Sequence, residues 1–76
     1  MNTALILIDI QNDYFEGGNS KLYHSEKAML NAEKVLNLFR ESQLPIFHVQ
    51  HINTSENAAF FKENSLGAEI YEKVKP

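Results

Sequence analysis

The stretch ALILIDI at residues 4–10 decides the fold class. It is a continuous apolar run that only Asp9 interrupts, and its length suits a strand buried on both faces. A second apolar run, IFHVQHI at residues 46–52, follows Pro45, which disfavours helical geometry in the residue before it. Strands buried on both faces are typical of parallel sheets, so we predict two parallel strands over these runs.

The residues between the two runs predict one helix. Ser25 followed by Glu26 is a favourable helix start, because serine caps helix N-termini and a carboxylate suits the first turn. Apolar side chains then recur at helical spacing, which predicts a helix over residues 26–42 with one buried face. That face consists of Ala28, Ala32, Val35, Leu36 and Phe39. Strand, helix and strand together form one right-handed βαβ unit.

Three further segments lack a strong period. Residues 11–25 are rich in Asn, Asp, Gly and Ser, and we expect an exposed loop there, over the C-terminal end of the first strand. Residues 53–66 are polar apart from an apolar insert at 58–61, which suits a short helical turn or a loop that plugs a cleft. Residues 67–76 contain apolar side chains spaced for a single helical turn.

One long helix is too little to cover a sheet whose strands look buried on both faces. A chain of 76 residues also buries only about 60% of the surface that its unfolded form exposes. A complete doubly wound domain adds further strands and helices. We therefore predict a Rossmann-like three-layer α/β/α fold with a parallel sheet, of which residues 1–76 are only the N-terminal βαβ part.

The overall charge and the length of the apolar runs exclude two kinds of partner. Ten acidic and seven basic residues give a net charge of −3, without the basic stripe that binding to a phosphate backbone requires. No apolar run approaches the roughly 20 residues that span a bilayer. We expect neither nucleic acid nor a membrane as a partner. No basic leader follows Met1, so we expect a cytoplasmic protein.

Asp9 is the first candidate for chemistry. A carboxylate at the end of an apolar strand is costly to desolvate unless a cation or hydrogen-bond donors hold it. In open α/β sheets the carboxyl ends of the strands line the ligand crevice, which would place Asp9 in the site. The structural alternative is that Asp9 caps the following loop through its own backbone, as aspartate often does.

The stretch ALILIDIQNDYFEGG at residues 4–18 resembles the opening signature of the isochorismatase-like cysteine hydrolases. That signature is an apolar strand, Asp, any residue, Gln, then Asn-Asp-Phe-like residues and a loop with glycine. In this family an aspartate, a lysine and a cysteine cooperate, and Asp9 matches the aspartate. The chain contains no cysteine, so the resemblance places the nucleophile and the lysine beyond residue 76. Lys73 and Lys75 are interpreted as solvated surface charges.

The resemblance implies a hydrolase that acts on a small amide, ureide or isochorismate-like substrate, most often at a C–N bond. Asp9 would act as general base toward the thiol, while the ammonium of the lysine stabilises the thiolate that attacks the substrate. Asp9 would then pass the proton to the leaving group. In the isochorismate-cleaving members the aspartate acts as an acid without a covalent step. No cofactor is implied.

Gln11, Phe15 and His51 are candidates for substrate binding. Gln11 and Phe15 match the family signature, and His51 lies at the C-terminal end of the second predicted strand, within reach of the cleft. Structural alternatives are turn stabilisation for Gln11 and packing of the loop for Phe15. His48 and His51 are three residues apart on a strand and face opposite sides, so we predict no metal site and interpret His48 as a packed histidine.

Two other classes of function compete with the hydrolase. Phosphotransfer enzymes with a strand-end aspartate need a second carboxylate two residues on, where Gln11 cannot ionise. Receiver domains need adjacent acidic residues for Mg²⁺, where Ile10 and Gln11 stand. Outside catalysis, the alternative is a hydrolase-like scaffold or oligomerisation module that lacks the cysteine and lysine. Members of the resembled family form oligomers, and Phe60 and Phe61 suit burial against more protein, so we expect a homo-oligomer.

Overall fold

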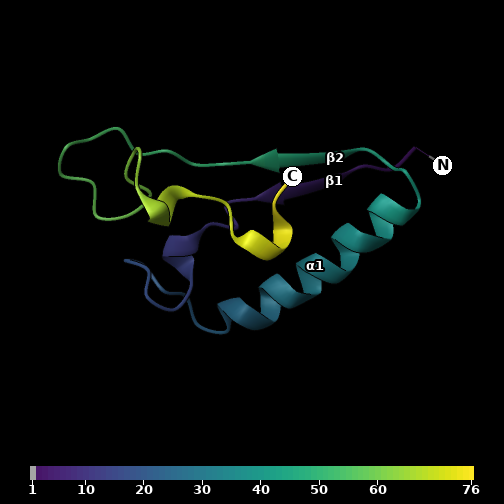
Figure 1. The fold of residues 1–76 in the computed structure, drawn as a ribbon, viewed down its shortest axis with the longest axis horizontal. Coiled ribbons are helices and arrows are strands. Elements are labelled where there is room, and N and C mark those ends of the chain that lie inside the picture. The colour runs from purple at the N-terminus through teal and green to yellow at the C-terminus, as the bar shows by residue number, and fades with distance from the viewer. Residues whose placement is uncertain (1) are drawn as a thin grey trace.

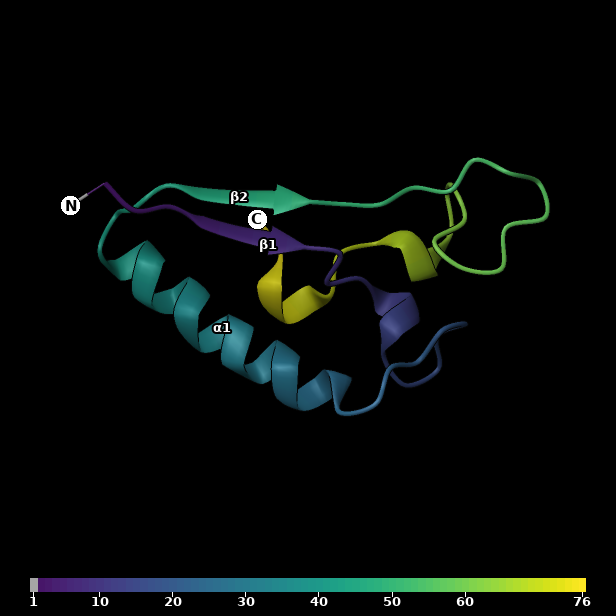
Figure 2. The same cartoon turned by 180° about the vertical axis from the view of Figure 1, so that it is seen from behind.

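The computed structural model describes residues 2–76 and contains one helix, two strands and three short 3₁₀ helices. In chain order they are β1 (Leu5–Ile8), η1 (Asn12–Tyr14), α1 (Ser25–Glu41), β2 (Ile46–Val49), η2 (Leu66–Ala68) and η3 (Glu72–Val74). The two strands lie side by side, with α1 running back along one side of them (Figure 1). Seen from behind, α1 begins just beyond the tips of the two strands and runs back along them (Figure 2).

β1 and β2 form a parallel pair, in register from Leu5 opposite Ile46 to Ile8 opposite Val49. The predicted pair of parallel strands joined by a helix is therefore confirmed. Both strands are shorter than predicted. Asp9 still donates its backbone N–H to the Val49 carbonyl at 2.9 Å, but its φ of 56° then turns the chain out of the extended ladder.

α1 matches the predicted helix to within one residue at each end, but it begins differently. The N-cap position belongs to His24, whose φ of 56° is left-handed and whose side chain makes no capping hydrogen bond. Ser25, which the sequence predicted as the cap, is the first helical residue. The prediction of a serine cap was wrong, because the turn before the helix places the serine side chain inside the protein.

The buried face of α1 is rotated from the predicted one. Met29 and Leu36 are buried, whereas Ala28 and Val35, both predicted to face inward, are exposed. The helical period was predicted correctly, but the buried face was placed too far to one side. Met29 occupies the inward position that the prediction gave to Ala28. The core combines side chains from β1, the first loop, α1 and η3. In chain order they are Leu7, Phe15, Met29, Leu36 and Val74.

One face of the two-stranded sheet is covered and the other is open. Leu7 on the covered face is 6% exposed. The opposite face exposes Ile6 (56%), Ile8 (60%), Phe47 (57%) and Val49 (46%). Ile6 is paired with Phe47 and Ile8 with Val49, so these four residues form one continuous apolar surface, the open sheet face. The inference that one helix cannot cover both faces is confirmed.

Residues 11–25 were predicted to be an exposed loop, and this is wrong for the first five of them. Gln11, Asp13 and Phe15 are 0%, 2% and 5% exposed. The 3₁₀ turn η1 directs these alternate side chains inward, where the polar ones satisfy backbone groups of other segments. The turn-forming residue types were recognised correctly, but their side chains serve the interior.

Residues 50–76 extend beyond the ends of the strands and then return beside β1 (Figure 1). Gln11 forms an isolated antiparallel bridge with Ile70, and Val74 in η3 completes the core. Phe61 is fully buried in a loop rather than in a helical turn, which corrects its assignment to contacts with other protein. Within residues 2–76, no helix is long and apolar enough to cross a membrane.

Candidate functional site

Asp9 lies at the carboxyl ends of the two strands and faces a concave surface. Its side chain is half-buried and lines a cavity of about 220 Å³. The left-handed φ of 56° is uncommon outside glycine and aims the side chain differently from the alternation of the preceding strand. Within residues 2–76, backbone N–H groups donate to the carboxylate of Asp13 and not to that of Asp9. The alternative that Asp9 caps the following loop therefore gains no support.

The Asp9 cavity is mainly apolar. Its other lining residues are Ile8, Ile10, Tyr14, Phe15, Leu22, Ser25, Ala28 and Met29. Asp9 is thus the charged residue of an otherwise uncharged lining. Pockets for drug-sized ligands occupy about 300–1,000 Å³, so this cavity suits a smaller molecule. Apolar walls exclude water, and a carboxylate there acts more strongly on a ligand than it would in solvent.

The structure brings one predicted binding residue, Phe15, to the same cavity as Asp9. Phe15 is 5% exposed and belongs to the hydrophobic core, where its ring lies 4.4 Å from that of Tyr71. The packing interpretation is therefore confirmed. Phe15 also lines the cavity, and its role in substrate binding stays a prediction.

Gln11 does not line the Asp9 cavity; its side-chain amide joins backbone segments instead. Its Nε2 donates to the carbonyls of His51 at 2.8 Å and Ala68 at 2.6 Å. Its Oε1 accepts from the backbone N–H of His51 at 2.8 Å. Because the side chain is completely buried, its polar atoms face the backbone rather than a ligand. This geometry matches the turn-stabilising alternative.

The two strand-side histidines also lie apart from Asp9. The ring of His51 is exposed and packs against Phe61 at a centroid distance of 5.5 Å, outside the residues that line the Asp9 cavity. His48 is half-buried, with Nε2 2.7 Å from the Val74 carbonyl oxygen, as expected for a packed strand histidine. Within residues 2–76, no three His, Asp or Glu side chains gather closely enough to hold a metal ion.

Asp13 is a structural anchor that the sequence analysis treated only as a turn former. Its carboxylate accepts hydrogen bonds from the backbone N–H of Phe61 at 2.6 Å and of Asn19 at 3.0 Å. The N–H···O⁻ geometry is that of charge-assisted hydrogen bonds, which are stronger than neutral ones. The signal was present in the sequence, because Asp13 belongs to the signature that resembles the hydrolase family.

Tyr14 is the second residue missed from the sequence. It lines the Asp9 cavity, and its ring packs edge-on against Phe61 at 4.7 Å and lies 6.4 Å from Phe60. The hydrogen bond that the Phe61 N–H donates to Asp13 holds Phe61 in place, and the Phe61 ring packs against Tyr14. A buried carboxylate outside the cavity therefore positions one of its walls.

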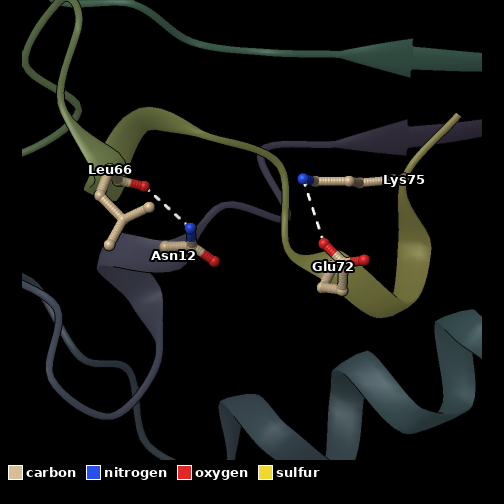
Figure 3. A network of polar contacts seen from close by, with 4 residues as sticks. All are labelled: Asn12, Leu66, Glu72 and Lys75. Carbon is tan, nitrogen blue, oxygen red and sulfur yellow. Dashed lines mark hydrogen bonds and ion pairs between the residues drawn. The ribbon is translucent and has the colours of Figure 1, made fainter.

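Polar contacts on the surface complete the attachment of the C-terminal segment (Figure 3). The Asn12 side chain donates to the Leu66 carbonyl at 2.8 Å, which joins η1 to η2. Lys75 pairs with Glu72 at 3.1 Å on the exposed side of η3. Lys75 is thus a surface charge, as the sequence predicted, and exposed pairs of this kind add little stability.

Comparison with known proteins agrees with this architecture. The sequence model of the isochorismatase domain matches residues 3–76. The uncharacterized isochorismatase family protein YddQ of Bacillus subtilis is 53% identical over 76 residues, which are 100% of this chain and 42% of that protein. The chain therefore spans well under half the length of this relative.

Solved structures show the same fold. The crystal structure of an isochorismatase hydrolase from Oleispira antarctica superposes with a TM-score of 0.92 at 43% identity, over 99% of this chain and 42% of that one. N-carbamoylsarcosine amidase from Thermoplasma acidophilum superposes with a TM-score of 0.86 at 23% identity, over 100% and 47% of the two chains. The predicted α/β fold and the resemblance stated from the sequence are both confirmed.

Proposed function

The chain belongs to the isochorismatase family of hydrolases, and on this premise we propose that it contributes Asp9 as the general acid and base for hydrolysis of a small amide or ureide. The observation that supports this proposal is the position of Asp9, which lies at the carboxyl ends of the two strands and is half-buried in an apolar cavity. A carboxylate so placed can accept a proton from a nucleophile and return it to a leaving group.

The chemistry requires partners from the rest of the protein. In the proposed reaction a cysteine beyond residue 76 loses its proton to Asp9, and a lysine stabilises the thiolate. The thiolate attacks the carbonyl carbon, the C–N bond breaks, and Asp9 protonates the departing nitrogen. Water then hydrolyses the acyl-enzyme. The amidase of the same fold is the basis for choosing a C–N bond.

The alternative is a hydrolase-like scaffold or oligomerisation module without catalysis. The absence of cysteine from these 76 residues supports it on the condition that no cysteine follows position 76. The two proposals differ in the residues that they require after position 76 of the full-length protein. A lysine-bearing strand and a cysteine at a helix start support the enzyme, whereas their absence supports the scaffold.

The test of the enzyme is the Asp9→Asn change in the full-length protein, assayed on a panel of small amides. Removing a general acid–base group is expected to lower kcat about 10²–10⁴-fold. Glu16→Gln is the matched control, because Glu16 is an exposed carboxylate outside the Asp9 cavity. Activity retained by Asp9→Asn would remove Asp9 from the mechanism.

A homo-oligomer also remains a proposal. The open sheet face suits burial against further protein, which can be a second copy or the rest of the same domain, but Phe61 no longer supports assembly because it is buried within its own chain. Light scattering of the full-length protein tests the assembly, and a monomer at all concentrations would contradict it.

A further inference from the structure

Ser25 carries a buried hydroxyl that has no hydrogen-bond partner among residues 2–76. The residue is 9% exposed, and its Oγ is enclosed almost completely. Buried side-chain hydroxyls are nearly always paired, because an unpaired one loses its hydration without compensation. Alanine would fill the same position of the helix without this loss. The hydroxyl therefore calls for an explanation outside the packing of the chain.

The position of Ser25 supplies that explanation. Ser25 lines the same cavity as Asp9 and is the first residue of the 17-residue helix α1. The start of α1 lies just beyond the tips of the two strands (Figure 2). The first helical hydrogen bond runs from the Ala28 N–H to the His24 carbonyl at 3.2 Å. The positive end of the helix dipole therefore lies at the first turn of α1, which begins with Ser25.

Asp9 and Ser25, two polar residues of the cavity lining, are chemically complementary. Asp9 carries a carboxylate that accepts hydrogen bonds, whereas Ser25 offers a hydroxyl donor at a helix N-terminus, where acceptors and anions are favoured. Apolar side chains, among them Phe15 and Met29, form most of the remaining lining. Rotation about χ1 of the serine moves its hydroxyl between three staggered positions, which lets it meet a ligand.

We propose that Ser25 and the first turn of α1 form a substrate subsite for a hydrogen-bond acceptor, a carboxylate or carbonyl oxygen remote from the scissile amide. This inference rests on the proposed function, in which the amide reacts beside Asp9. The substrate class is then a small amide with a short apolar spacer and an acceptor oxygen at its other end. Ser25 acts as a specificity residue, whose hydroxyl turns into the cavity to donate to the substrate.

Binding measurements on the full-length protein test the subsite. Asp9→Asn is used as the background so that turnover is slow during the measurement, and calorimetry gives Kd for succinamate, succinamide and pentanamide. These three amides carry, at the far end, a carboxylate, a neutral carbonyl or no acceptor. Adding Ser25→Ala is expected to weaken the first two about tenfold relative to pentanamide. Ser42→Ala, at an exposed serine just after α1, is the control and should change these ratios less than about twofold.

The pattern of losses identifies the acceptor. A larger loss for succinamate assigns the subsite to a carboxylate, and equal losses for succinamate and succinamide assign it to any carbonyl oxygen. Unchanged ratios in Ser25→Ala overturn the subsite, and so does a failure of all three amides to bind at millimolar concentration. Hydrolysis retained by Asp9→Asn alone refutes the proposed function instead, whatever these binding ratios are.

A stability measurement separates the subsite from a structural role. Removing an unpaired buried hydroxyl should leave Tm of the ligand-free protein unchanged or higher, while substrate binding weakens. If Ser25→Ala lowers Tm, the hydroxyl is bonded elsewhere in the full-length protein, and the subsite is overturned.

Discussion

The backbone N–H of Phe61 donates a hydrogen bond of 2.6 Å to Oδ2 of Asp13, across 48 positions of the chain. Both residues are buried, and Phe61 has a left-handed φ of 53°, an outlier for an aromatic side chain. A second hydrogen bond, from the Asn53 N–H to the Phe61 carbonyl at 2.7 Å, holds the other side of this residue. The strained conformation persists because both backbone groups are fixed.

Asp13→Asn tests this anchor. The amide keeps one acceptor oxygen but turns a donor toward a backbone N–H, so one buried donor loses its partner. We expect the free energy of unfolding of the full-length protein to fall by about 2–3 kcal/mol, measured by urea denaturation. Glu63→Gln, at an exposed carboxylate, should stay within about 0.5 kcal/mol. Equal effects of the two changes would show that Asp13 is not an anchor.

Gly67→Ala probes the space beside the same carboxylate. A Cβ at Gly67 would overlap the Asp13 side chain, so the anchor must shift. Gly17→Ala is the matched comparison, because Gly17 has a φ of 84° but nothing within 4 Å of the added Cβ. We expect a cost of about 1 kcal/mol at Gly17 from backbone strain alone, and a cost of about 2 kcal/mol or more at Gly67 from overpacking. Thermal unfolding that ranks the two variants in the opposite order would contradict the crowding.

The local pattern of the sequence was sufficient for the elements but not for their ends. The continuous apolar runs predicted the parallel strands, because a strand buried on both faces has no polar alternation. They did not show that β1 stops at Ile8, since the left-handed turn at Asp9 leaves no mark in an apolar run. The capping preference of serine likewise misplaced Ser25, because burial of its side chain overrode the local preference.

The sequence predicted the location of a residue where its position along a strand determines that location. It missed the roles of residues that depend on contacts distant in sequence. Asp9 follows an apolar strand, and the edge of a parallel sheet places such a residue at the cavity. Gln11 and Asp13 owe their roles to partners 40 and 48 residues away, which no local pattern reveals. Short polar side chains in a loop look alike until the fold decides which of them turn inward.

Gln11→Glu tests the other buried polar side chain. The change keeps the shape but replaces an amide that donates to two carbonyls with oxygens that repel them. We expect a loss of roughly 2–4 kcal/mol in unfolding free energy, measured by chemical denaturation, because a buried donor becomes an unpaired acceptor or charge. Gln43→Glu, at an exposed position, is the control. A loss at Gln11 no greater than at Gln43 would mean that the amide does not hold these segments.

Phe47→Ser examines whether the open sheet face is covered in the full-length protein. Phe47 is 57% exposed here and lies in register with Ile6, so the face is apolar across both strands. Parallel strands are normally covered on both faces, and this chain spans 42% of a close relative. We propose that the rest of the same domain packs on this face. Replacing the phenyl ring with a hydroxyl should then destabilise the full-length protein by about 3–5 kcal/mol, as for other buried phenylalanines.

Tyr23→Ser is the control for the open sheet face, because Tyr23 is 91% exposed at the turn before α1 and should tolerate the change within about 0.5 kcal/mol. Unfolding curves of the two full-length variants give the comparison. If Phe47→Ser is as harmless as Tyr23→Ser, the face remains in solvent and residues 1–76 do not form part of a larger three-layer domain. If it is strongly destabilising, the missing layer packs on the open sheet face, on the side of the sheet opposite α1.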